Sequence, residues 1–393
     1  MASKMTGKPS YAPSGPGAVA AGPRTVYRVN IPDKPGGAPG SYHAAYNLNV
    51  PGRPGTVSAD YHTRDGTTGA RHHANQAALA AQKPAALAGA TMGTTWSARL
   101  ALPPHLTIDA VRAAIQQALD KVVAQMSTWD SASDLSRYNC ADQGWQPLPH
   151  DCLHVLQHAL QLAADTQGAY DPTIGPLVNA WGFGPPPYAS EPPSADTIAG
   201  LRQRCGWQRV RLDRDGMCGW QPGGIYLDLS AIAKGYGVDL AAQALNALGV
   251  THYLMEVGGE LRARGRRPDG QPWRVAIEVP DGSNDHALNL VLSDLSIATS
   301  GDYRRYRDSA MGRFAHTIDP RTGQPVSNGV ASVTVIHADC MHADALATAL
   351  TVLGERDGMA YAHRHRLAAL FIVRDGHDLR LAASDAFATL ARQ

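Results

Sequence analysis

The sequence has few cysteines and almost no net charge, and each of these features argues against a class of protein. Its five cysteines are widely spaced along 393 residues and form no Cys-x-x-Cys pair, which argues against a disulfide framework and favours reduced thiols. The 35 basic and 34 acidic residues leave a net charge of +1, without a long block of either sign. The charge pattern therefore indicates neither nucleic acid nor an anionic membrane as an obligate partner.

Long apolar runs are also missing. No run is long enough to span a bilayer, and the N-terminus has neither the apolar region of a signal peptide nor a lipobox-like cysteine. As the sequence stands, we therefore expect a soluble, cytoplasmic protein without a transmembrane segment. A truncated or misassigned N-terminus would remove that expectation and allow a periplasmic or membrane-anchored protein.

Composition divides the chain into two parts. The first 60 residues contain 18 glycines and prolines but only one isoleucine and one leucine. Such a segment cannot bury enough apolar surface to offset its conformational entropy. We therefore expect a disordered or loosely folded extension and linker over residues 1–85, followed by one folded domain over residues 86–393.

The folded part mixes helix and strand patterns without a strict strand–helix–strand rhythm, which favours an α+β fold. Helices are expected where Thr107 can cap an amphipathic run, where a periodic run ends at Gly168, and at two later places. Strands are expected in the short alternating runs, including a C-terminal hairpin that turns at Asp375-Gly376. The expected helical ranges are 107–129, 152–168, 342–353 and 356–366, the expected strand ranges are 90–102, 252–265, 273–279, 287–301, 331–339 and 367–384, and residues 225–249 are expected as a strand running into a helix.

The stretch HADCMHADALATALTVLG, residues 337–354, carries two alternative metal sites. His337, Cys340 and His342 have the side chains that zinc prefers. Asp344 and Thr348 are four residues apart at the start of a helical pattern, so they face the same way and offer oxygen ligands to Mg²⁺. The residues alone leave both sites open.

A second group of histidines occurs earlier in the chain. His150, His154 and His158 recur every four residues and would share one face of a helix. Cys152 is nearby, but no fourth ligand at metal-site spacing accompanies them in the sequence. We therefore interpret them as a polar stripe on an amphipathic helix rather than as a zinc site.

Three further segments place polar residues beside turns or helix starts. DLSAIAKGYGVD (228–239) sets Lys234 in the first turns of a helix, where a lysine can add its charge to the anion-binding N–H groups. EVGGELRARG (256–265) sets two glycines beside a carboxylate, which is typical of a close ligand approach or of a β-bulge. His316, in HTIDPRTG (316–323), is either a general base or a packed core histidine.

Taken together and in this order, eight segments resemble the ApbE-like FAD:protein FMN transferases. The resemblance spans about residue 86 to the C-terminus and does not cover the extension. The segments are TMGTTW (91–96), MSTWDSASDLSRYN (126–139), GAYDPTIGPLVNAWGFG (168–184), DLSAIAKGYGVD (228–239), EVGGELRARG (256–265), IATSGDYRRY (297–306), HTIDPRTG (316–323) and ADALATAL (343–350).

The resemblance implies a T-fold-like, single catalytic domain of mixed strands and helices. It also implies a Mg²⁺-dependent enzyme that takes FAD as its substrate and moves the FMN moiety to a threonine or serine of a target flavoprotein, with release of AMP. The same architecture is compatible with a Mg²⁺-dependent FAD pyrophosphatase that yields FMN and AMP. A non-catalytic FAD-binding protein is the third alternative.

The resemblance also implies roles for individual residues. His316 matches the histidine with a proposed catalytic role, and Mg²⁺ would be held by the carbonyl of Ala231 with Asp344 and Thr348. This set favours magnesium over the zinc alternative. The residues expected to contact the flavin or the nucleotide are Met92, Trp129, Ala169, Tyr170, Asp171, Asp228, Lys234 and Ile318.

The extension contains a degraded copy of the motif that these enzymes modify. The expected acceptor pattern in a target flavoprotein is D-x-x-[ST]-G-A-[ST], and DGTTGAR occurs at residues 65–71. Arg71 stands where the acceptor hydroxyl belongs. We therefore do not expect self-modification there and expect a separate flavoprotein as the partner.

Overall fold

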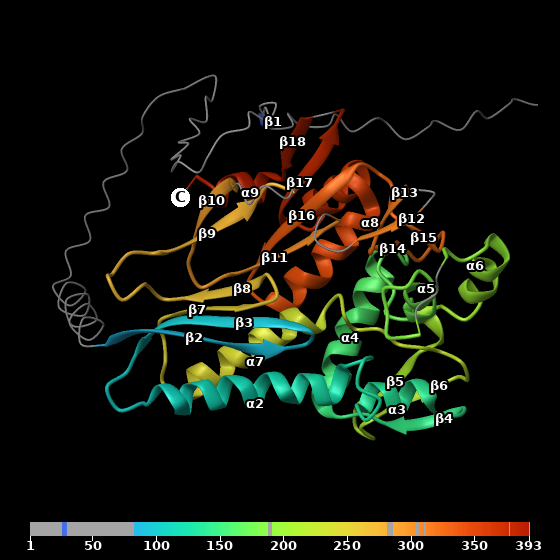
Figure 1. The fold of residues 1–393 in the computed structure, drawn as a ribbon, viewed down its shortest axis with the longest axis horizontal. Helices are drawn as coiled ribbons and strands as arrows, with labels where there is room; N and C mark the ends of the chain where they lie inside the picture. Colours follow the sequence, from blue (N-terminus) through green and yellow to red (C-terminus); the bar gives the residue numbers. More distant parts are fainter. Residues whose placement is uncertain are drawn as a thin grey trace, which may run out of the picture.

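A large antiparallel sheet forms the frame of the protein (Figure 1). The computed structural model describes residues 26–29, 82–187, 191–280, 286–302, 306–309, 312–376 and 378–392. Within these ranges the sheet has nine strands, and each strand pairs antiparallel with its neighbour. In sheet order they are β1 (Val26–Val29), β18 (Asp378–Ala383), β17 (Ala368–Asp375), β16 (Val330–His337), β11 (Ser296–Gly301), β8 (Glu260–Arg264), β7 (Tyr253–Val257), β3 (Thr94–Leu102) and β2 (Lys83–Thr91).

Both faces of the sheet are covered by apolar contacts. In β17, Leu370 and Ile372 join one core cluster while Phe371 and Val373 join another, as the alternation of a strand requires. The first cluster is closed by the hairpin of β9 (Trp273–Glu278) and β10 (His286–Leu292) and by α9 (Asp385–Leu390). The other face is covered by three helices that pack on one another, namely α2 (Ile108–Met126), α7 (Ala233–Ala247) and α8 (Cys340–Arg364).

The remaining elements form a second, mainly helical part beside α8, on the right of Figure 1. Its core packs α4 against the start of α8 through Leu156, Ala159, Met341 and Ala345. None of the helices described here is long and apolar enough to cross a membrane. The elements of this part are α3 (Asp134–Cys140), β4 (Gly144–Pro147), α4 (His150–Asp165), α5 (Gly175–Ala180), α6 (Ala195–Arg202), a 3₁₀ turn (Trp207–Arg209), β5 (Arg211–Asp213) and β6 (Cys218–Gln221), with β12 (Tyr306–Ser309), β13 (Gly312–Ala315), β14 (Ile318–Asp319) and β15 (Gln324–Pro325) as two small hairpins nearby.

The expected α+β fold is confirmed, and so are several element ends. The Thr107 hydroxyl caps α2 by accepting from the N–H of Ala110, and Gly168 follows α4 with φ of +80° while its N–H donates to the carbonyl of Ala163. The C-terminal hairpin is present, but α9, which the sequence reading did not include, follows it. Strand β2 begins at Lys83, three residues before the expected start of the domain at residue 86.

The expected extension lies mostly outside the described residues. Only β1 and residues 82–85 of it are described, and β1 pairs with β18 at the edge of the sheet. The motif DGTTGAR at residues 65–71 also lies outside them. The division at residue 85 therefore stays a prediction.

One expected strand is wrong. Residues 225–229 are alternating and buried, yet they form no strand. Side chains replace the missing partner strand, because Asn139 donates to the carbonyl of Leu227 (2.9 Å) and accepts from its N–H (2.7 Å). Gln221 does the same for Ile225, at 3.0 and 3.1 Å. The alternating apolar residues of this segment thus indicate that it is buried, but not that it belongs to a sheet.

The Asn139 contact can be tested by stability. Asn139→Ala would leave the N–H and carbonyl of Leu227 unpaired beside a fully buried side chain, so we expect a loss of about 1–3 kcal/mol in the free energy of unfolding. Urea unfolding measures this loss. Exposed Gln157 on α4 is a matched control, and Gln157→Ala should change stability by less than about 0.5 kcal/mol. Equal unfolding midpoints for the two variants would contradict this role of Asn139.

Candidate functional site

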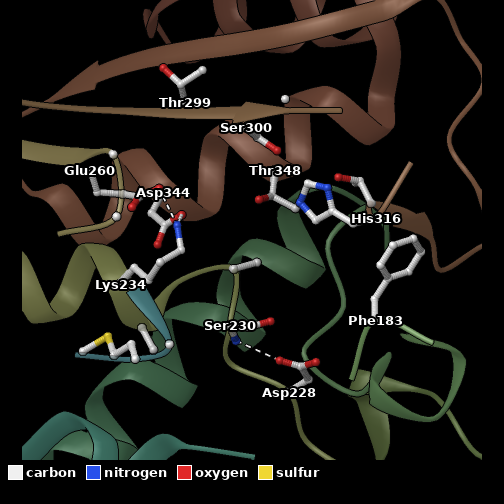
Figure 2. A pocket seen from close by; sticks show the side chains of 18 of the residues that line it. Phe183, Asp228, Ser230, Lys234, Glu260, Thr299, Ser300, His316, Asp344 and Thr348 are labelled. Atoms are coloured by element: carbon white, nitrogen blue, oxygen red, sulfur yellow. Dashed lines mark hydrogen bonds and ion pairs between the residues drawn. The ribbon is translucent and has the colours of Figure 1, made fainter. Parts of the chain in front are cut away.

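The expected site residues lie on the walls of one cavity of about 1250 Å³. The turn between β7 and β8, strand β11 and helix α8 form one side of it, and loops from the helical part form the other (Figure 2). The structure brings all twelve expected residues to this cavity, although it does not by itself assign their roles. They are Met92, Trp129, Ala169, Tyr170, Asp171, Asp228, Ala231, Lys234, His316, Ile318, Asp344 and Thr348.

A lysine between two buried carboxylates is the main charged feature of the cavity. The Nζ of Lys234 lies 2.5 Å from Oε1 of Glu260 and 4.0 Å from Oδ1 of Asp344. Glu260 is 2 % exposed and Asp344 is 6 % exposed, whereas a third of the Lys234 side chain remains accessible. Figure 2 shows the three side chains together at one end of the cavity.

Burial and charge act against each other in this cluster. Burial raises the pKa of Glu260 and of Asp344, and the lysine charge offsets only part of that effect. Burial alone would lower the pKa of Lys234, but the carboxylates of Asp344 and Glu260 outweigh it and raise that pKa. The lysine therefore stays charged, and the cluster carries one negative charge in excess only when both carboxyl groups are ionised.

Two glycine positions make this cluster possible. A Cβ on Gly235 would lie 2.3 Å from the carbonyl oxygen of Cys340 and 2.8 Å from Cβ of Asp344, so only glycine lets α7 approach the start of α8 so closely. The N–H of Gly235 donates to Oδ2 of Asp344 at 2.9 Å. In the β7–β8 hairpin, Gly258 and Gly259 form a two-residue turn with φ of +59° and +109°, which returns the chain at Glu260 beside Lys234.

The residues expected to hold Mg²⁺ fit that ion. Asp344 and Thr348 project from the same face of α8 toward the cavity (Figure 2), and Ala231, just before α7, also lines the cavity. Carboxylate, hydroxyl and carbonyl oxygens are the ligands that Mg²⁺ prefers. A cation bound beside this cluster would favour the ionised form of both carboxyl groups, and Oε2 of Glu260 is buried without a hydrogen-bond partner among the described residues.

The alternative zinc set is not assembled. Cys340 is fully buried, and its Sγ lies 3.6 Å from the carbonyl oxygen of Leu261, at the first turn of α8. Burial raises the pKa of this thiol well above its usual value, which disfavours the thiolate that zinc needs. Among the described residues, His337, Asp339 and His342 bring possible ligand atoms close together, and the Cys340 thiol is not part of this group.

His316 stands on the opposite side of the cavity from the carboxylate cluster. Its ring is partly buried and meets the ring of Phe183 edge to face, with 6.3 Å between the centroids. Figure 2 shows the imidazole directed into the cavity. The position is compatible with a proton acceptor, and the partial burial argues against a purely core residue.

The two aromatic candidates differ strongly in exposure. The side chain of Trp129 is 53 % exposed in the loop after α2, where the Ser127 hydroxyl accepts from the N–H groups of Trp129 and Asp130. Tyr170 is only 4 % exposed, and its hydroxyl has no hydrogen-bond partner among the described residues. Trp129 therefore presents far more aromatic surface than Tyr170 does.

Asp171 and Asp228 shape the loops on which the site is built. Oδ1 of Asp171 accepts from the N–H and the hydroxyl of Thr173, at 2.8 and 2.7 Å. Oδ1 of Asp228 accepts from the N–H of Ser230 at 2.8 Å, and its own N–H donates to the carbonyl of Pro172. Each carboxylate thus shapes its own loop, the backbone bond from Asp228 to Pro172 joins the two loops, and both residues line the cavity.

Glu260 is the main residue that the sequence reading missed. The glycines of EVGGELRARG predicted a close ligand approach or a β-bulge, and that pattern assigned no role to Glu260. A carboxylate directly after a Gly-Gly turn is a signal that could have indicated it, since a tight hairpin brings its last residue back toward the first strand. Its partner, Lys234, is 26 residues away, and only the fold shows that the two meet.

Comparison with known proteins gives a consistent result. Residues 92–371 match the ApbE family. The FAD:protein FMN transferase of Vibrio cholerae is 39 % identical over 313 residues, which cover 78 % of this chain and 93 % of that protein. The FAD:protein FMN transferase of Haemophilus influenzae is 38 % identical over 317 residues, which cover 78 % of this chain and 92 % of that protein. The crystal structure of the Pseudomonas stutzeri flavinyl transferase ApbE, apo form, superposes with a TM-score of 0.74 at 38 % identity and covers 79 % of this chain and 98 % of that one. The chain belongs to the ApbE family.

Proposed function

We propose that this protein is an FAD:protein FMN transferase that moves the FMN moiety of FAD to a threonine or serine of a target flavoprotein and releases AMP. The relatives that carry this name cover most of the chain. The observation that supports the proposal most directly is the single cavity in which Asp344, Lys234 and His316 face a common space. Its volume of about 1250 Å³ is sufficient for a dinucleotide.

The reaction is a phosphoryl transfer. The acceptor hydroxyl oxygen forms a new bond to the phosphorus that carries the riboflavin, and the bond from that phosphorus to the bridging oxygen of the pyrophosphate breaks. The bridging oxygen leaves with AMP, and the hydroxyl proton must pass to a base. In this cavity His316 is the group that we assign to accept it.

The charged cluster serves the leaving side of the reaction. Lys234 is held by Glu260 and Asp344, so its charge is fixed in place before FAD binds. When bound to Asp344, Thr348 and the carbonyl of Ala231, Mg²⁺ supplies charge neutralisation for the pyrophosphate. Trp129 presents the exposed ring against which the isoalloxazine can stack.

The proposal is tested by one incubation with two readouts. The protein is incubated with FAD, Mg²⁺ and a peptide that carries a D-x-x-[ST]-G-A-[ST] motif, our proposed acceptor sequence. We expect the peptide to gain the mass of the FMN moiety while an equal amount of AMP appears. AMP and free FMN without modified peptide would identify a pyrophosphatase instead, and FAD binding without either product would identify a carrier.

Asp344→Asn tests the carboxylate on α8. Asparagine keeps an acceptor for the N–H of Gly235, and Lys234 keeps Glu260, so we expect the variant to fold. Loss of the negative charge should lower FMN transfer by roughly 100-fold or more, because several kcal/mol of charge stabilisation are removed. Single-turnover transfer and thermal melting measure the two effects. The matched control is Asp109→Asn at the exposed start of α2, and equal turnover of the two variants would disprove the assignment.

His316→Ala tests the proton acceptor. We expect transfer to fall by roughly 10²–10⁴-fold, the usual contribution of a general base. FAD affinity should change much less, because the charged cluster and Trp129, which also line the cavity, are left unchanged. A packed core histidine would behave differently, lowering the melting temperature while the activity of each folded molecule is preserved. Transfer, FAD binding and melting are therefore measured on the same preparation.

A further inference from the structure

Two histidine groups that are far apart in the sequence meet outside the cavity. His158 lies on α4, His337 ends β16, and His342 is in the first turn of α8, which packs on α4. The rings of His158 and His342 meet edge to face with 4.7 Å between their centroids, and those of His337 and His342 are 5.0 Å apart. Asp339, the N-cap residue of α8, completes the group. None of these four residues lines the cavity.

His342 is oriented by one ring nitrogen, and its other ring nitrogen has only the Asp339 carboxylate beside it. Its Nε2 lies 3.2 Å from Nδ1 of His158, a hydrogen-bond distance between two rings. Its Nδ1 is buried and makes no hydrogen bond to any residue that the structure describes, and the carboxylate oxygen Oδ2 of Asp339 lies 3.5 Å from it. If Nε2 donates to His158, the lone pair of Nδ1 points toward Asp339. A buried ring nitrogen and a carboxylate oxygen this close together can both coordinate one metal ion.

His337 is also held by one nitrogen. Its Nδ1 lies 3.2 Å from the carbonyl oxygen and 3.0 Å from the N–H of Asp339. With Nδ1 accepting from the N–H, the ring proton is on Nε2; in the other tautomer, Nδ1 donates to the carbonyl oxygen, as metal-bound histidines usually do, and Nε2 is free for an ion. One ligand atom from each of His337, Asp339 and His342 lies within 4.8 Å of the other two. Small side-chain rotations would bring the three to a common ion.

The dipole of α8 disfavours a cation at its first turn, but the Asp339 carboxylate stands at that end and offsets it.

We propose that His337, Asp339 and His342 form a second metal site, for a divalent transition-metal ion such as Zn²⁺, with His158 orienting His342 from the outer shell. Two imidazole nitrogens and one carboxylate oxygen suit zinc and disfavour magnesium, which prefers oxygen ligands. The site is distinct from the Asp344 site, although both involve the start of α8. A bound ion would tie the end of β16 to α8, and it would stabilise the folded state by its binding free energy.

Zinc binding to the whole, metal-stripped chain tests this site. Competition with a chromophoric zinc chelator gives both the stoichiometry and the affinity of zinc binding. Both are needed because other histidines in the chain can also bind zinc. We expect the double variant His337→Ala/His342→Ala to bind one Zn²⁺ fewer than the wild type and to lose the rise in melting temperature that Zn²⁺ gives. His158→Ala should weaken the affinity by about 10–100-fold, as loss of an outer-shell partner does.

Controls separate loss of ligands from loss of fold. His105→Ala removes an exposed histidine outside the cluster and should bind zinc as the wild type does. His342→Gln retains a polar side chain of similar size, and melting without metal shows whether each variant is folded. Visible absorption of the Co²⁺-loaded protein should show the intense bands of four- or five-coordinate Co²⁺, and the double variant should lack them. Equal zinc stoichiometry and affinity in folded wild type and double variant would overturn the proposal, whatever the transferase activity.

Discussion

The contact of Lys234 with Glu260 and Asp344 is the interaction on which the rest of the site depends. It joins helix α7, the β7–β8 turn and helix α8 at the point where the sheet meets the helical part. A buried cluster of this kind gives little net stability, because the desolvation of three charges offsets their attraction. Its value lies in the fixed charges that it holds at one end of a large cavity before any substrate arrives.

The fold supplies this contact through close packing and not through the charges alone. Gly235 lets α7 and α8 approach, and the N–H of the same residue holds Asp344. The Gly258-Gly259 turn then returns Glu260 to the lysine. Loops ordered by Asn139, Asp171 and Asp228 carry further lining residues, so part of the cavity depends on side-chain hydrogen bonds in segments without regular structure.

The sequence predicted the location of the site better than its internal contacts. Helix starts such as Thr107 are local and were read correctly, and the resemblance of ordered motifs brought residues as distant as Met92 and Thr348 to one cavity. The strand expected at residues 225–229 failed because an alternating apolar pattern reports only burial, and Asn139 replaces the partner strand. Glu260 was missed, and His158 was separated from His342, because pairings 26 and 184 residues apart leave no local signal.

We propose that Asp344 and Thr348 bind the metal that accompanies the pyrophosphate of FAD in the cavity. A crystal structure of the protein with FAD and Mn²⁺, with an anomalous difference map recorded at the manganese edge, tests this binding most directly. We expect an anomalous peak coordinated by the Asp344 carboxylate and the Thr348 hydroxyl, in contact with the pyrophosphate, and the flavin near Trp129. A peak that Asp344 does not ligate, or FAD bound outside the cavity, would contradict it.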